Sequence, residues 1–481
     1  MPSQKSTANS GNIEKFKINS NVSSRSIDLC AGVGEIRYYE SIMSNAITAS
    51  AVITETGFVD SNNPNRPSTQ PSTLDWLPIR GGERVDFVIE DAQEQPNQIS
   101  FSGSASDGLY VNRVKNVVSG TQQEMYTLDL SSKEYFSNDL TRVTKRYDGS
   151  IAENVKTIVE EVLEGTWADG DGVDGKDIDI TLNPYNFIGN TRKPFYVCTW
   201  LGSKAVPQIS TDDGGNGVGG AAGYLFYQTR DGYHFKSLDI IWQQAQENRD
   251  NLKKYIYNNT GDSVEGYDAN VVSYNINQDI DLNEKLVLGT YNNTSIFFDY
   301  YAFNYETRPY TITDQQESGV VTAAEDYSEL VAEEFRQSPS RGMSHIMDFG
   351  VMPSGTSSDE QLEEWKNDPE KPNYDAKNVM VQSIMRYQQV FTISVTIVIP
   401  ADFSIKAGDV IVCDFPTVEG TANADTNEQT GGLYMVASVC HRITPRETFT
   451  SLDLVRDSFG GTTGSSSSGA GGAVNNDVLF F

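Results

Sequence analysis

The sequence predicts a mainly β protein with two antiparallel β-barrel domains, an α/β module and a small helical insert. Three observations carry this prediction. In many short segments apolar and polar residues alternate with a period of two, which is typical of strands with one buried face. The period changes to that of a helix near residue 150 and again after residue 311. Strand patterns then return, and two β-rich units of similar size suggest a duplicated barrel.

Length and charge exclude several classes of protein. A chain of 481 residues is too long for one ordinary core, and about two to four domains are expected. Its 66 acidic and 36 basic residues give a formal net charge of −30. Binding to a phosphate backbone depends on Lys and Arg displacing counterions, so this composition disfavours sequence-specific nucleic-acid binding and anionic membranes. Solubility is the ordinary role of such an excess.

The cysteines and the N-terminus indicate a soluble protein of a reducing cytosol. The four cysteines show no zinc-site spacing and are expected to be free thiols: Cys30, Cys198, Cys413 and Cys440. The first residues contain no apolar core of a signal peptide, and no segment has the roughly 18 apolar residues of a membrane helix.

Residues 1–21 are polar and aperiodic, and we expect a flexible arm there. Strand patterns fill residues 22–148, the first barrel domain, interrupted by the Pro-rich segment "SNNPNRPSTQPST". The apolar sets of two later strands of this unit are Val85, Phe87 and Ile89, and Tyr126, Leu128 and Leu130.

One strand of the first unit, residues 47–54, is polar on one face only. Ile47, Ala49, Ala51 and Ile53 alternate with Thr48, Ser50, Val52 and Thr54. A period of two places these two sets on opposite faces of a sheet. We expect the Ile/Ala face to lie against a core, which leaves a mostly hydroxyl face outward.

Residues 149–255 form the predicted α/β module. A helix is expected over 150–163, with Ser150 and Glu153 as a capping box and Gly165 as its terminator. A hairpin is expected about Arg230, Asp231 and Gly232, because Asp-Gly between alternating apolar residues favours a tight turn.

The second barrel is predicted from residues 256–310 and 380–458, with residues 311–379 inserted as an acidic helical segment. The insert holds 15 acidic and 5 basic residues. Its first helix is expected to carry Tyr327, Leu330, Val331 and Phe335 on one face, and its second is expected to begin at Ser358 and Gln361 and to carry Leu362 and Trp365.

Residues 459–481 are a Gly/Ser tether that ends in an apolar tip. We expect the tip, Val478, Leu479, Phe480 and Phe481, to be a docking peptide for another protein component, because exposed apolar ends favour aggregation unless they bind something. The alternative is a tail that folds back on its own subunit.

No motif for catalysis, cofactor or metal binding stands out. "GNGVGG" at 215–220 matches a dinucleotide loop but lacks the flanking strand and helix, so a plain loop is the simpler interpretation. The acidic stretch 169–179 has Val173 and Asp174 where a calcium loop needs an oxygen ligand and a glycine. The three histidines accompany no nucleophile elbow. His441 and Cys440 are neighbours in a strand and point to opposite faces. The sequence therefore predicts no enzyme and no cofactor.

Several blocks, in order, resemble one known family. "GEIRYYESIMSNAITASAVITETG" with "LPIRGGERVDFVIED" is similar to the opening of the central baseplate hub subunit of contractile-tail, T4-like bacteriophages. "MYTLDLSSKEYFSNDLTRVTKRYDGSIAENVKTIVEEVL", "PFYVCTWLGSKAVP" and "LFYQTRDGYHFKSLD" continue the resemblance. "FSIKAGDVIVCDFP" and "GLYMVASVCHRITPRETFTSLDLVRDS" are similar to the family's closing barrel strands. The spike proteins of type VI secretion are related.

The resemblance implies two tail-tube-like barrel domains per chain and a homotrimer that forms a short tube of pseudo-sixfold symmetry. That tube would join the tail tube, or a tube-initiator protein, to the central spike protein and let DNA pass. It would contact neighbouring baseplate proteins in the virion tail after assembly in the host cytoplasm. Thr48, Ser50 and Thr54 would then face the channel or a neighbouring subunit. The alternative is that they lie on the outside of an ordinary barrel. A carbohydrate-binding or carbohydrate-active β protein is the alternative function, given the many Tyr, Asn and acidic residues.

Overall fold

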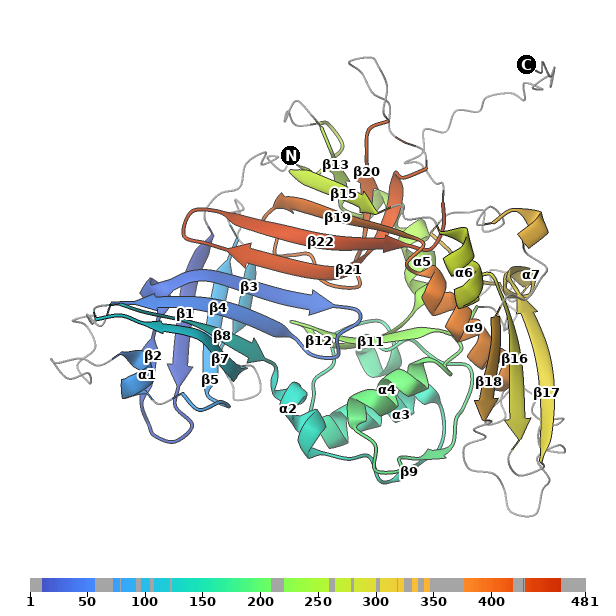
Figure 1. The fold of residues 1–481 in the computed structure, drawn as a ribbon, viewed down its shortest axis with the longest axis horizontal. Helices are drawn as coiled ribbons and strands as arrows, with labels where there is room; N and C mark the ends of the chain where they lie inside the picture. The colour runs from blue at the N-terminus through green and yellow to red at the C-terminus, as the bar shows by residue number, and fades with distance from the viewer. Residues whose placement is uncertain are drawn as a thin grey trace.

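A computed structural model of the protein shows a mainly β architecture, with most helices below and to the right of the large sheet in the view of Figure 1. The described residues are 11–56, 72–77, 79–91, 97–103, 108–121, 123–208, 220–258, 264–277, 281–299, 303–317, 319–323, 331–335, 341–346, 376–417, 427 and 429–459. No helix within these ranges is long and apolar enough to cross a membrane.

The first part of the chain is built from short antiparallel strands. Its elements are β1 (Asn12–Asn19), β2 (Ser26–Asp28), η1 (Cys30–Gly32), β3 (Val33–Ser41), β4 (Thr48–Glu55), α1 (Thr73–Trp76), β5 (Arg84–Glu90), β6 (Gln98–Phe101), β7 (Leu109–Ser119), β8 (Glu124–Ser131) and α2 (Lys133–Leu140). Residues 12–19, expected in a flexible arm, instead form β1, which pairs antiparallel with β2 and β5. Phe16 and Ile18 explain the difference, because both side chains are fully buried in the first core.

The alternation predicted for residues 47–54 is confirmed. Ile47, Ala49, Ala51 and Ile53 are buried in a core shared by strands β1 to β8. β4 lies between β3 and β8, antiparallel to both. The other face of β4 is partly exposed.

The middle of the chain forms an α/β module on one side of the sheet. Its elements are β9 (Arg146–Tyr147), α3 (Ile151–Ile158), η2 (Val159–Leu163), η3 (Val173–Gly175), β10 (Phe187–Ile188), α4 (Pro194–Gly202), β11 (Tyr224–Thr229), β12 (Gly232–Ser237), α5 (Leu238–Glu247) and η4 (Arg249–Asn251). Their apolar side chains make a second core.

The predicted helix of the module is present, but its end differs. Ser150 caps it by accepting a hydrogen bond from the Glu153 amide. After Ile158 the helix widens into the π-helical turn η2, and it ends with Glu164 in the left-handed conformation at φ 55°. Gly165 is therefore not the terminator, because the residue before it already reverses the backbone.

The predicted hairpin is confirmed. β11 and β12 pair from Tyr224 with Ser237 to Thr229 with Gly232. Arg230 and Asp231 form the two-residue turn, and Gly232 follows at φ 136°, where a side chain would meet the backbone of Trp167.

Later strands complete the large sheet. They are β13 (Lys254–Ile256), β14 (Ala269–Asn270), β15 (Ser273–Asn277), β19 (Ile393–Pro400), β20 (Val410–Asp414), β21 (Gly432–Ile443) and β22 (Thr448–Arg456). β21 pairs antiparallel with β3, so strands from both ends of the chain belong to one sheet (Figure 1). The described strands form no closed barrel; instead the sheet branches at β21 and at β5.

The segment between these strands is not only helical. It contains α6 (Leu282–Leu288), β16 (Asn292–Asp299), β17 (Asn304–Thr311), α7 (Ile312–Glu317), η6 (Glu333–Phe335), β18 (Arg341–Ile346) and α9 (Ala376–Gln389). β16 pairs with β17 and β18 in a separate three-stranded sheet. The expectation that 256–310 belongs wholly to the second barrel, and 311–379 to a helical insert, is therefore wrong for β16, β17 and β18. Their alternation with a period of two shows which face is buried and not which sheet a strand joins. Tyr327, Leu330 and the helix expected from Ser358 lie outside the described residues.

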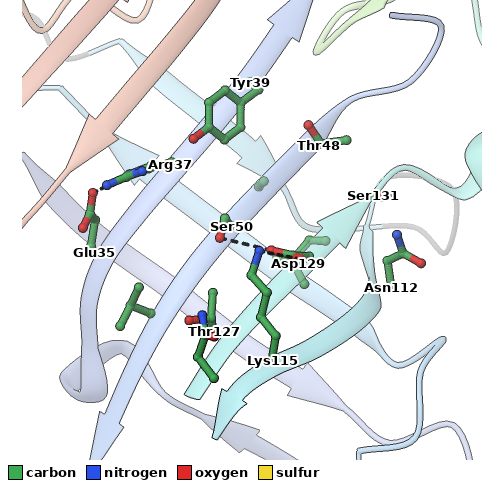
Figure 2. Close-up of a pocket in the computed structure, with 14 residues that line it drawn as sticks. Glu35, Arg37, Tyr39, Thr48, Ser50, Asn112, Lys115, Thr127, Asp129 and Ser131 are labelled. Atoms are coloured by element: carbon green, nitrogen blue, oxygen red, sulfur yellow. Dashed lines mark hydrogen bonds and ion pairs between the residues drawn. The ribbon is translucent and has the colours of Figure 1, made fainter. Parts of the chain in front are cut away.

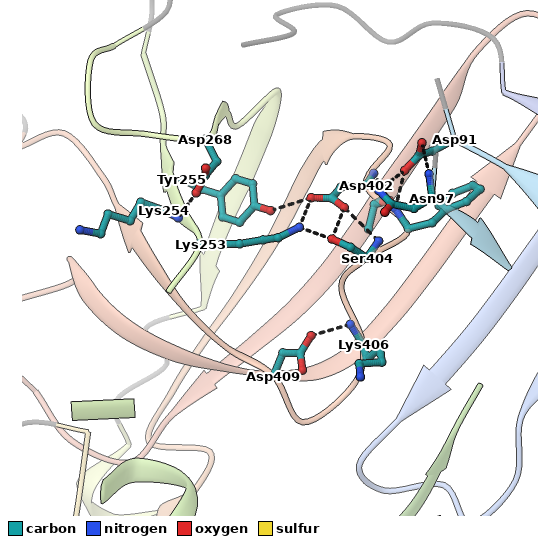
Figure 3. Close-up of polar contacts among 12 residues, drawn as sticks. Asp91, Asn97, Lys253, Lys254, Tyr255, Asp268, Asp402, Ser404, Lys406 and Asp409 are labelled. Carbon is teal, nitrogen blue, oxygen red and sulfur yellow. Dashed lines mark hydrogen bonds and ion pairs between the residues drawn. The ribbon is translucent and has the colours of Figure 1, made fainter. Parts of the chain in front are cut away.

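Buried polar contacts hold the parts of the chain together. Glu40 of β3 is 2% exposed and accepts hydrogen bonds from the Tyr38 hydroxyl (2.7 Å), the Arg230 amide (2.9 Å) and the Ala407 amide (3.1 Å). Figure 3 shows a second junction, where Asp402 accepts from the Ser404 hydroxyl and from Lys253. The Phe403 amide beside it donates to Asp91, which follows β5. These contacts join the first strands, the module and the last strands.

Candidate functional site

The candidate functional site is the polar face of the large sheet. It lies on the side away from the first core and from a further core formed by the buried residues of β19, β21 and β22. Eight strands follow one another across it in the order β15, β19, β22, β21, β3, β4, β8 and β7. Along β3, β4 and β19, and in the second half of β21 and most of β22, the residues that point to this face alternate with residues that are buried. The polar face therefore continues from the second half of the chain onto the first without a break in strand pairing.

The register brings polar side chains into rows across this face. Arg442 of β21 lies opposite Arg37 of β3, which lies opposite Ser50 of β4 and then Asp129 of β8. A second row runs from Thr396 through Asp453 to Ser438. The Ser438 hydroxyl donates to Asp453 at 2.5 Å and the Thr396 hydroxyl at 2.8 Å.

Three of the cations on this face are held on carboxylates. Glu35 accepts from Arg37 at 2.6 Å and from Arg442 at 2.8 Å, and Lys115 lies 2.8 Å from Asp129. Partial burial alone would raise the pKa of Glu35, but the two guanidinium groups outweigh it and lower that pKa below its usual value. Glu35 thus stays ionised and keeps both arginines paired.

A shallow cavity of about 550 Å³ lies on the face where β3, β4, β8 and β7 adjoin (Figure 2). Figure 2 shows the Ser50 hydroxyl and Lys115 both directed to Asp129. The lining residues are Glu35, Arg37, Tyr39, Thr48, Ala49, Ser50, Val52, Asn112, Lys115, Asn116, Thr127, Asp129, Leu130 and Ser131.

The structure locates only part of the residues singled out in the sequence. Thr48 and Ser50 line the cavity, and Thr54 lies further along the same strand face, half-buried. Val478, Leu479, Phe480 and Phe481 lie outside the described residues. The sequence reasoning missed Glu35, Arg37, Lys115, Asp129 and Arg442. Alternation along a strand indicates which of its sides is polar, but it does not show which strands are neighbours in the sheet. The sequence therefore did not show that these residues lie together.

Two edges of this eight-stranded path are open among the described strands. β15 pairs only with β19. β7 pairs with β8 along its length, but with β5 only at Leu109 and Tyr110. Beyond Val111, β7 offers an unpaired edge that carries the exposed side chains of Val117 and Val118. Open edges of this kind are sites where another chain adds a strand.

One buried cluster has the order of groups found in hydrolases. Nε2 of His234 lies 2.7 Å from the Thr229 hydroxyl, and Nδ1 lies 2.5 Å from Asp177. Thr229 is only 1% exposed, and Tyr227 stacks on the imidazole at 4.8 Å between ring centroids. The hydroxyl is closed off from solvent, so the cluster stabilises the packing of the hairpin on the stretch that contains Asp177.

The acidic stretch 169–179 does not gather a metal-binding set. Within the described residues, no three or more His, Cys, Asp or Glu side chains group as metal ligands. Two of its carboxylates form ion pairs instead, Asp174 with Lys156 and Asp177 with Lys236. The "GNGVGG" segment lies outside the described residues except for Gly220.

No protein-family model and no curated protein matches the chain. Solved structures of tail proteins are similar to it. A tail protein from Neisseria meningitidis MC58 has 10% identity and a TM-score of 0.46, over 94% of this chain and 97% of that chain. A prophage tail protein from Listeria monocytogenes EGD-e has 9% identity and a TM-score of 0.42, over 92% and 94%. An E. coli component of the type VI secretion system has 8% identity and a TM-score of 0.35, over 94% and 79%. These are the classes of protein that the sequence blocks resemble, and identities this low assign no residue roles.

Proposed function

We propose that this chain is a structural subunit of a phage tail baseplate, a hub that forms a trimeric ring between the tail tube and the central spike. The observation that carries the proposal is the continuous polar face, which spans both halves of the chain. Among the described strands it ends at β15, which pairs only with β19, and at the part of β7 beyond Val111. The β7 edge of one subunit would adjoin the β15 edge of the next. Such a head-to-tail contact closes a ring when the rotation fits.

The dimensions of such a ring suit a channel. Three copies would place about 24 strands side by side, and at about 4.8 Å per strand the wall would be roughly 115 Å around and roughly 37 Å across before strand tilt widens it. That leaves room for a DNA double helix once side chains are in place.

The chemistry of the face suits passage rather than binding. Phosphates bind where Lys and Arg release counterions. On this face Arg37, Arg442 and Lys115 are already paired with carboxylates, and hydroxyls such as Thr48 and Ser50 lie between them. Arg113, opposite Asp129 in register, is exposed and would attract phosphate. DNA would slide along this wall with little retention.

A bifunctional maleimide tests the ring directly. The variant Val117→Cys/Asn275→Cys has one exposed thiol on β7 and one on β15. Cross-linking should give a covalent trimer on a denaturing gel, and native mass spectrometry of the unmodified protein should give three copies. In the matched control, Val117→Cys/Leu140→Cys, the second thiol is also exposed but lies on α2, and no cross-linked trimer is expected. If native mass spectrometry gave a monomer and the two variants cross-linked to the same extent, the proposed trimeric ring would be refuted.

Carbohydrate binding is the second candidate, and the cavity is the observation that favours it. Tyr39, Asn112, Asn116 and Asp129 offer an aromatic ring, two amides and a carboxylate, the groups that sugars engage. We expect no retention on polysaccharide and no glycan turnover, because a channel wall needs neither. A monomer retained on polysaccharide, and released by Asp129→Asn, would favour this candidate over the hub.

A further inference from the structure

Among the described residues, one face of the three-stranded sheet carries exposed apolar side chains at one end. Phe298 of β16 lies opposite Tyr305 of β17 and Ile346 of β18, so the three side chains form one row across the sheet. They are 40%, 69% and 71% exposed, and Ile296 beside them is 37% exposed. This apolar row, defined by these four residues, is a cross-strand cluster on a sheet whose two outer strands, β17 and β18, pair with no further described strand.

The opposite face of the same sheet is already occupied. Phe297 is 1% exposed and stacks on His345, and α9 packs against β16 and β17. The sheet is therefore attached to the rest of the protein through the face that carries Phe297, and the apolar row lies on the opposite face. Contiguous apolar surface of this kind marks a binding surface.

The described part of the chain ends at Phe459, which lies beside this sheet. Phe459 packs in a small core with Tyr291, the residue directly before β16, and with Ile312 directly after β17. Figure 1 shows the three strands extending away from the helices α6 and α7 at that end. Phe298 is seven residues beyond Tyr291, which corresponds to about 23 Å along the strand.

The chain that follows Phe459 has the length and the chemistry to reach the row. Residues 460–477 are rich in Gly, Ser, Asn and Thr, and a chain of this composition spans about 24 Å root-mean-square, or roughly 60 Å when extended. It ends in Val478, Leu479, Phe480 and Phe481. A linker whose root-mean-square length matches the span gives the highest effective concentration at the site, on the order of 1 mM.

We propose that residues 478–481 bind the apolar row of their own subunit. The two terminal phenylalanines would pack on Phe298 and Tyr305 as offset or edge-to-face aromatic pairs. A contact with an intrinsic Kd of only about 0.1 mM would then be about nine-tenths occupied. The inference does not depend on ring formation, since donor and acceptor belong to one chain.

Disulfide trapping in the full-length protein tests this contact. Thr307→Cys places an exposed thiol on the same face, in register with Ile296, and leaves the apolar row intact. Together with Phe481→Cys, mild oxidation should form an intrachain disulfide, detected by peptide mapping. The matched control carries the same two cysteines with Val478→Ser, Leu479→Ser and Phe480→Ser. Its rate should fall at least fivefold, because the tether remains and only the apolar contact is lost. Phe298→Ser should produce the same fall.

The alternative results are distinct. An unchanged rate in the serine control would overturn the inference, since tethering alone would then explain the trapping. A disulfide between two chains would also overturn it and would assign the row to the tip of a second copy. Failure of ring formation in the maleimide experiment would leave this result unaffected.

Discussion

Replacing Arg386 with Met should destabilise the protein strongly at neutral pH. Arg386 of α9 is fully buried, with Nε 3.1 Å from Asp239 and one terminal nitrogen 2.6 Å from Asp457. The other terminal nitrogen donates to the carbonyl of Val321 at 2.6 Å. Asp239 and Asp457 are also fully buried, so the variant leaves two carboxylates without their cation.

The expected loss follows from this geometry. Removing one partner from a buried ion pair costs about 3–5 kcal/mol. Each carboxylate keeps one backbone donor, the amide of Ala221 at 2.6 Å or of Ala323 at 2.9 Å, so we expect the lower end, about 3 kcal/mol at pH 7.5.

The loss should depend on pH. Burial raises the pKa of Asp239 from 3.8 to about 6, even with Arg386 beside it. Because the folded state holds this proton more tightly, the stabilisation from protonation is full below pH 3.8 and is lost as the pH rises through about 6. Without Arg386 this pKa rises further. Between pH 7.5 and about pH 6 only the variant then gains stability from protonation of this carboxyl, whereas below about pH 6 both proteins do. The loss should therefore be about 2 kcal/mol smaller at pH 5 than at pH 7.5, at about 1.4 kcal/mol per pH unit.

Urea denaturation at pH 7.5 and pH 5 measures both effects. Arg142→Met replaces an exposed arginine and should change the free energy of unfolding by less than about 0.5 kcal/mol. Combining Arg386→Met with Asp239→Asn and Asp457→Asn should recover most of the loss, because neutral amides need no cation. A loss below about 1 kcal/mol at pH 7.5, or one that is equal at both pH values, would refute this reasoning.

Three further predictions concern stability. Val159→Asp places a carboxylate in the module core, where Val159 is fully buried, and should cost several kcal/mol; a parental melting temperature would contradict the packing of η2. Glu40→Leu leaves the amides of Arg230 and Ala407 unsatisfied and should cost about 3 kcal/mol by urea denaturation, whereas Glu40→Gln, which keeps one acceptor, should cost about half as much. Burial lowers the pKa of His441 from 6.5 to about 3, so the contribution of neutral His441 to the free energy of unfolding is fully present above pH 6.5 and is lost as the pH falls. The parent should therefore lose about 2 kcal/mol of stability from this residue between pH 7 and pH 5, and His441→Phe should remove that part of the change. An unchanged pH profile of unfolding in the variant would contradict this prediction.

Local patterns determined much of the secondary structure. The Ile/Ala side of β4, the Ser150 cap and the Arg230–Asp231 turn depend on near neighbours in the chain, and each is where the sequence predicts it. The same logic would have found β1, since Phe16 and Ile18 alternate with lysines. A period of two depends only on which side of a strand is buried, so one chain suffices to show it.

Only the tertiary structure decided which strands are neighbours. Nothing local in "GLYMVASVCHRI" shows that β21 pairs with β3, which lies about 400 residues earlier, or that Arg442 therefore meets Glu35. β16 alternates as β15 does, yet the two belong to different sheets. The polar face, the triple contact at Glu40 and the buried pairs of Arg386 all join residues far apart in sequence. Strand pairing and buried charge depend on long-range packing, because backbone hydrogen bonds between strands are the same for every sequence and only the assembled core selects among the partners.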